Sequence, residues 1–298
     1  MPADTLAQDL DAAYAARDWR RMAATALSGL VHEPGRPEAW MMLSVAAAQT
    51  GDTSQARTGF ARTAAILPQW PDAWANLGRT ETAARSARAF RRALALAPQT
   101  VELLSPLGLA LLGLGDGNGA ARLLRRAHGF DRDACEICVN LGLALASLED
   151  DDSAGWFAAA VVLAPQEFAA HLNLGLQLLA VGDVAASREA ARRALALQPA
   201  SVDAIRLDAA LLRASARPGD AARLLESIAS TAPDGAAVAV QLAVARLDQR
   251  RLEAAYEALA GAYRRDPLRL TSIREVLSAS PTGELWFRVE KLQQRLGL

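Results

Sequence analysis

The chain has little of several residue types that mark whole classes of protein. Two of its 298 residues are cysteines, Cys135 and Cys138, and only one of its 32 basic residues, Lys291, is a lysine. Two cysteines cannot build a disulfide framework. The net charge of −1 lacks the basic excess by which general nucleic-acid binders release counterions. We therefore expect no nucleic-acid partner, and we interpret the scarcity of lysine as the codon usage of a GC-rich bacterial genome.

Long apolar runs are missing as well. No stretch reaches the roughly 18 uninterrupted apolar residues that a membrane span needs. Residues 1–21 interleave Asp and Arg with Ala and Leu and contain no apolar core of the signal-peptide type. We therefore expect a cytoplasmic protein without membrane insertion. Aromatic residues make up 5% of the chain, whereas alanine and leucine dominate, and both favour helix.

An internal repeat dominates the sequence. The segment 37–68 returns about every 34 residues along the chain, a period typical of helical repeat proteins. Its recurrent features are a Trp or apolar residue, a Leu-Gly pair, a Gly-Asp turn and a closing Pro, seen most clearly at Trp40, Leu43, Gly51 and Pro68. Apolar residues follow the helical spacing on both sides of the turn, and proline ends the second run. Each copy therefore predicts helix A, a turn and helix B.

Eight such copies in one frame resemble the tetratricopeptide repeat. The resemblance implies an all-α fold, a right-handed α-solenoid of about eight helix-turn-helix repeats followed by C-terminal capping helices. The expected units are 3–36, 37–70, 71–100, 101–134, 135–167, 168–201, 202–235 and 236–269, with the cap at 270–298. The cap is expected because Leu285, Val289, Leu292 and Leu296 form one apolar stripe.

Residues that could carry catalysis or bind a metal have simpler structural interpretations. Cys135 and Cys138 show CxxC spacing, but no second ligand pair accompanies them, so a packed core residue is favoured over a zinc or redox site. His171 occupies the Trp position of its repeat. The acidic run 149–152 falls in a turn, where helix capping explains it. We expect no metal, no cofactor and no enzyme activity.

Arginine pairs recur at one repeat position on helix B, which the resemblance places on the convex side. They are Arg91-Arg92, Arg125-Arg126 and Arg192-Arg193. One interpretation is a basic stripe for an acidic partner or nucleic acid, and the other is a solvated outer face balanced by acids elsewhere. The second is favoured because no aromatic residues are interleaved for base stacking.

The resemblance also implies that helix A lines a concave groove. Carrying the family's groove positions onto this sequence gives a mainly apolar set with a few amides: Asn76, Arg79, Leu109, Leu112, Val139, Asn140, Leu143, Leu172, Asn173, Leu176, Leu179, Val240 and Val244. No lysine stands at the position that grips a chaperone's C-terminal carboxylate. These leucines could instead pack between neighbouring helices or against the chain's own C-terminal segment.

The sequence therefore predicts a non-catalytic adaptor or scaffold that binds a peptide or amphipathic helix of a protein partner in this groove. The chain could also form a homo-oligomer. The alternative is a substrate-recruiting or scaffolding subunit of a modifying enzyme, of glycosyltransferase or sulfotransferase type, or of an envelope or secretion assembly machine. The partner's identity does not follow from the sequence.

Overall fold

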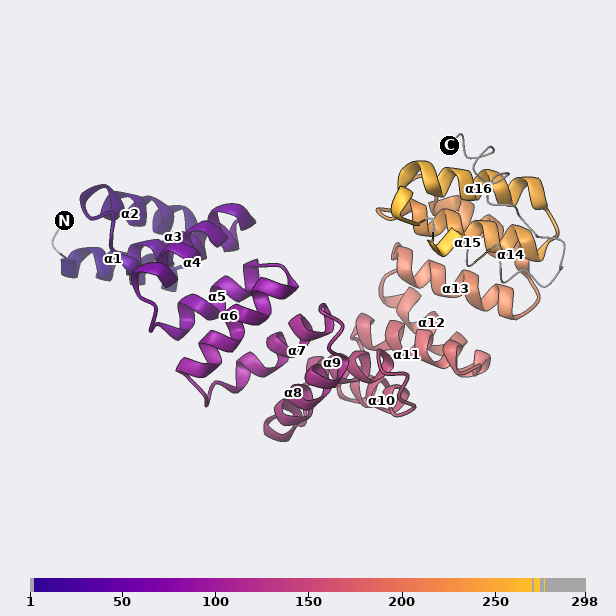
Figure 1. Cartoon of the computed structure of the whole chain (residues 1–298), viewed down its shortest axis with the longest axis horizontal. Helices are drawn as coiled ribbons and strands as arrows, with labels where there is room; N and C mark the ends of the chain where they lie inside the picture. Colours follow the sequence, from indigo (N-terminus) through magenta and orange to yellow (C-terminus); the bar gives the residue numbers. More distant parts are fainter. Residues whose placement is uncertain (1–2, 270, 274–275, 277–298) are drawn as a thin grey trace. The chain divides into compact units, whose positions relative to one another are not determined.

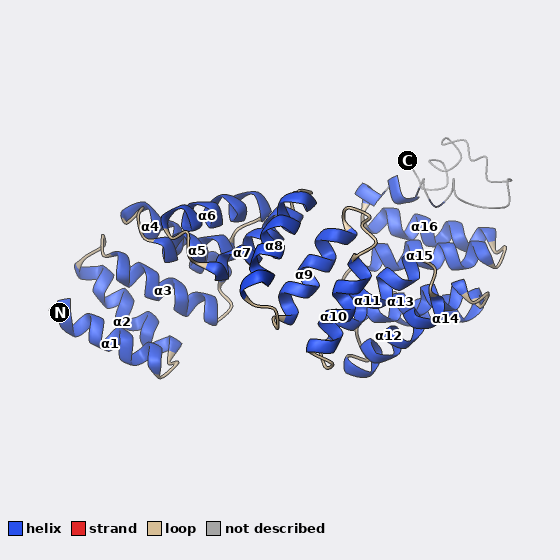
Figure 2. Cartoon of the chain, turned by 90° about the horizontal axis from the view of Figure 1, so that it is seen from below, coloured by secondary structure: helices blue, strands red, loops and turns tan. Residues whose placement is uncertain are grey.

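The fold is a succession of antiparallel helix pairs. A computed structural model describes residues 3–269, 271–273 and 276. Figure 2 shows helices joined by short loops, with no strand in this part of the chain. The predicted all-α repeat solenoid is confirmed. The predicted cap at 270–298 lies almost entirely outside the described residues.

Sixteen α-helices lie within residues 3–265 and alternate along the chain as the A and B helices of the repeat (Figure 1). In the first half the pairs are α1 (Ala3–Ala15) and α2 (Trp19–His32), α3 (Pro37–Gln49) and α4 (Thr53–Ile66), α5 (Pro71–Thr80) and α6 (Ala83–Leu96), and α7 (Leu104–Leu112) and α8 (Gly117–Phe130). Helix α9 (Cys135–Ala146) is followed in the chain by α10 (Ser153–Leu163). The remaining pairs are α11 (Phe168–Ala180) and α12 (Val184–Leu197), α13 (Val202–Ala214) and α14 (Pro218–Ile228), and α15 (Gly235–Asp248) and α16 (Leu252–Arg265). Two short 3₁₀ helices are η1 (Val101–Leu103) and η2 (Pro267–Arg269).

The chain divides into two compact units. Unit 1 ends at Ser153 and unit 2 begins at Ala154. Within each unit, neighbouring A helices contact one another, as α7 does with α9 and α13 does with α15. Because the A helices approach each other in this way, they form the inner side of each row of pairs and the B helices form the outer side.

The turn between helix A and helix B has the same backbone in most pairs. Gly51, Gly115 and Gly182 have φ values of 86°, 77° and 86°, in the left-handed region that glycine adopts without steric cost. The next residue is an aspartate, which begins helix B by accepting a hydrogen bond from a backbone N–H three residues on, as Asp52 does from Gln55 (2.9 Å). Four other turns place a non-glycine residue there: Arg17, Glu149, Ala216 and Arg250.

The Leu-Gly pair of helix A marks a close approach between the two helices of a pair. A Cβ on Gly78 would lie 2.9 Å from the Phe90 ring, and one on Gly108 would lie 2.9 Å from Leu124 Cγ. Both distances are too short for real Cβ contacts. The glycine is therefore needed so that helix B can bring a large apolar side chain against helix A.

The Trp position of the repeat makes the same hydrogen bond in three pairs. The donors and their acceptor carbonyls are Trp40 Nε1 to Pro34 (2.8 Å), Trp74 Nε1 to Pro68 (2.9 Å) and His171 Nε2 to Pro165 (3.0 Å). With its proton on Nε2, His171 thus replaces the indole N–H. Cys138 holds the same position and is 1% exposed, as expected for a packed core residue.

Candidate partner-binding surfaces

The inner face of unit 1 presents some of the predicted groove residues and buries others. Leu109 on α7 is 40% exposed, and Leu112 and Leu143 are partly buried. Val139 and Asn140 on α9 are buried. The leucines are therefore accessible to a partner, whereas Val139 and Asn140 pack inside the row of helices.

Each of the three predicted asparagines donates from its side-chain amide to another atom of the chain. Asn140 Nδ2 donates to Ser105 Oγ at 3.0 Å, and Asn76 Nδ2 lies 3.7 Å from Met41 Sδ; each bond joins an A helix to the preceding A helix. Asn173 Nδ2 donates to the Ala169 carbonyl of its own helix (2.9 Å). Each bond uses one of the two N–H groups of the amide and so reduces the donors left for the backbone of a partner.

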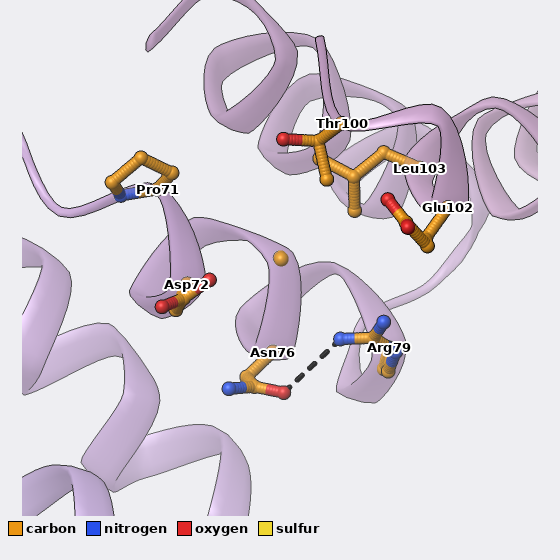
Figure 3. A pocket seen from close by; sticks show the side chains of 8 residues that line it. Pro71, Asp72, Asn76, Arg79, Thr100, Glu102 and Leu103 are labelled. Carbon is orange, nitrogen blue, oxygen red and sulfur yellow. Dashed lines mark hydrogen bonds between the residues drawn. The ribbon is translucent and has the colours of Figure 1, made fainter. Parts of the chain in front are cut away.

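A pocket of about 290 Å³ lies on the inner face of unit 1, beside α5 (Figure 3). Two predicted residues, Asn76 and Arg79, line it, and Arg79 NH1 donates to Asn76 Oδ1 at 3.1 Å. The remaining lining residues are Pro71, Asp72, Ala75, Thr100, Glu102 and Leu103. The last three belong to η1 and its approach, which the prediction missed because it placed groove residues on regular A helices only.

The inner face of unit 2 begins with an apolar stripe on α11. Leu172, Leu176 and Leu179 follow the i, i+4, i+7 spacing that puts side chains on one face of a helix. Leu176 is 46% exposed, and the other two pack partly against Leu207 and Leu211. The stripe is thus anchored at its edges and open at its centre.

Farther along unit 2, the inner face becomes ionic. Arg206 on α13 donates to Gln241 on α15 (2.9 Å), and Arg213 donates to Asp248 (2.7 Å). The predicted Val240 and Val244 on α15 are partly buried. In this unit the apolar part of the inner face therefore lies mainly on α11, and the face is polar at α13.

The two cysteines form no visible reactive centre. Burial raises the pKa of the Cys138 thiol, and the neighbouring Cys135 and Asp131 add to the rise. A raised pKa keeps the thiol protonated and unreactive. In the described part of the chain, no group of three or more His, Cys, Asp or Glu side chains is placed to hold a metal ion. None of its helices is long and apolar enough to cross a membrane.

A tetratricopeptide repeat family model matches residues 10–74. A search of curated proteins finds no match. Among solved structures, a tetratricopeptide repeat protein from Parabacteroides merdae has a TM-score of 0.67 at 16% identity, covering 81% of this chain and 97% of the other. The Cut9–Hcn1 hetero-tetramer of APC/C gives a TM-score of 0.67 at 13% identity, covering 94% of this chain and 56% of the other.

A third structure, YrrB, is described as a protein of this repeat type with an unusual peptide-binding site. It has a TM-score of 0.50 at 18% identity and covers 62% of this chain and 98% of its own. At these identities the structures establish the fold. The chain therefore has the fold of tetratricopeptide repeat proteins, and its residues 10–74 match that family's model.

Proposed function

We propose that the chain is a non-catalytic adaptor that holds a segment of a partner protein on the inner face of its A helices. The observation that carries the proposal is the stripe on α11, where Leu176 leaves nearly half of its surface exposed between two anchored leucines. Exposed leucines at helical spacing suit the apolar face of an amphipathic helix. The peptide-binding site named for YrrB, which has the same fold, supports this choice.

The expected affinity is moderate. Each leucine that a partner buries fully contributes roughly 1.5–3 kcal/mol. Association and side-chain ordering consume much of this gain, so a dissociation constant in the micromolar range, on the order of 10⁻⁶ M, is expected. Because Asn173 already donates to its own helix, recognition depends on apolar side chains more than on the partner's backbone.

The test uses a displayed library of amphipathic helical peptides selected against the full chain. Fluorescence anisotropy then measures the selected peptide with the wild type and with Leu176→Asp. The substitution places a charge where the peptide buries apolar surface, so binding weakens by about tenfold or more. Leu109→Asp provides the same test in unit 1.

The matched control is Val162→Asp. Val162 lies on the B helix α10 of unit 2 and is 79% exposed, so it is an accessible apolar residue on a different helix from the α11 stripe. This variant should bind as the wild type does. If Leu176→Asp binds the peptide as well as Val162→Asp does, the inner-face assignment is wrong.

A further inference from the structure

The outer helices of unit 1 carry a concentration of arginine with no acidic residue. There are two arginines on α4, four on α6 and three on α8, and none of these helices contains Asp or Glu. All nine side chains are exposed. We call these nine residues the arginine face.

The arginine face repeats from helix to helix. Arg88, Arg91 and Arg92 on α6 recur 34 residues later as Arg122, Arg125 and Arg126 on α8. Because equivalent positions of a repeat point the same way, these side chains form parallel rows across neighbouring helices. Within each helix they are also three and four residues apart, so like charges are neighbours.

These charges are not neutralised locally. Within the described residues, Arg85 is the one member with an acidic partner, Glu81 at 3.8 Å. Arg62 lies over the Trp40 ring, 5.7 Å from its centroid. We expected acidic residues elsewhere to neutralise the arginines of the outer face. In the described part of unit 1, Arg85 is the one arginine of this face that forms such an ion pair. Like charges at this spacing weaken a helix, so the fold itself gains nothing from them.

In unit 2, the outer helix α12 carries an acidic residue that neutralises its neighbouring arginines. Glu189 on α12 stands where α6 has Arg88 and α8 has Arg122. It pairs with Arg192 and Arg193, which are the equivalents of the arginine pairs in unit 1. An acidic residue is therefore tolerated at this position, and it is missing from the arginine face.

We propose that the arginine face of unit 1 binds a short acidic segment of a partner protein. Guanidinium groups bind carboxylates through two parallel hydrogen bonds, and a row of them suits a segment rich in Asp and Glu. A long nucleic acid fits less well, because the chain as a whole has a net charge of −1. This surface is separate from the inner face, so an adaptor with both could hold two partners.

The experiment measures a fluorescein-labelled oligoglutamate of about ten residues, long enough to span two neighbouring helices, by anisotropy with the full chain. The double variant Arg88→Glu/Arg122→Glu copies the Glu189 pattern into both helices. We expect binding to weaken by about tenfold or more, and the salt dependence of the remaining binding to become shallower. Circular dichroism checks that the helices are retained.

The matched control is Arg192→Glu/Arg193→Glu in unit 2, which changes the net charge by the same amount at already balanced positions. It should leave binding close to wild type. Equal losses in the two double variants would mean that only the net charge matters, which overturns the proposal. So would an absence of oligoglutamate binding, or tighter binding of oligothymidylate or of phosphatidylserine vesicles. None of these outcomes depends on whether the inner face binds a peptide.

Discussion

The outer helices of the two units share a fold but differ in charge balance. In unit 1, α4, α6 and α8 hold nine arginines and no acid. In unit 2, α12, α14 and α16 hold six arginines and five acids, and several of these form ion pairs. Because both sets of helices occupy the same place in the repeat, the fold does not require either pattern. The acidic partner proposed for unit 1 would account for this difference.

The structural frame, in contrast, is shared by both units, and the strongest predicted effects lie in the turn between helix A and helix B. Gly115 in unit 1 has φ 77° with open space around it, whereas Ala216 in unit 2 has φ 57°. An L-residue in this region costs roughly 1–2 kcal/mol relative to glycine. We expect Gly115→Ala to destabilise the chain and Ala216→Gly to stabilise it, each by about 1 kcal/mol, in urea unfolding curves. Shifts of the same sign would show that the two turns are not equivalent.

A similar comparison removes one helix cap from each unit. Asp116 accepts a hydrogen bond from the Gly119 N–H at 2.8 Å, and Asp183 accepts one from the Ala186 N–H at 3.0 Å. Replacing either aspartate by alanine should cost about 1 kcal/mol, the usual value of such a cap. The free energies of unfolding of the two variants should agree closely. A clear difference would mean that one cap has a role beyond its own helix.

A smaller effect is expected when unit 2 is given the charge pattern of unit 1. Glu189→Arg removes the partner of Arg192 and Arg193, both of which are exposed. Each such helical pair is worth about 0.2–0.5 kcal/mol, and the new arginine repels the same residues by a similar amount. Thermal unfolding should therefore shift slightly downward, while affinity for oligoglutamate should rise. If the affinity for oligoglutamate does not rise, the pattern of arginines is not what binds the acidic peptide.

The smallest effect concerns a carboxylate of unit 2. Burial raises the pKa of Asp208, and the positive charges of Arg188 and Arg217 oppose that rise. A folded-state pKa above the unfolded value means that stability is lost as pH rises through the folded pKa. Asp208→Asn should therefore stabilise the chain slightly at pH 7 and lose this advantage at acidic pH. Melting curves at several pH values measure the change, and a constant difference across pH would contradict the assignment.

The sequence predicted the fold because its signals are local. The Leu-Gly pair, the turn aspartates and the terminal prolines each act within one repeat, and they recur at Gly78, Asp116 and Pro165 with the same structural roles. The role of Cys138 as a buried residue also followed from its place in the frame.

The surfaces were harder to predict because they depend on neighbours in other repeats. The family position of Asn140 could not show that its amide meets Ser105, 35 residues earlier. The pocket beside α5 includes Glu102 because η1 interrupts the regular pattern. The balance of the outer arginines likewise depends on which acids lie within reach, as Glu189 does in unit 2 alone.

The most direct test measures thermal stability and oligoglutamate affinity together in Arg88→Glu/Arg122→Glu. The new acids would lie three and four residues from Arg91 and Arg92 on α6, and from Arg125 and Arg126 on α8. Replacing repulsion by attraction should raise the melting temperature while the affinity falls, since the arginine face serves a partner at the expense of the fold. A lower melting temperature accompanied by unchanged affinity would contradict this account.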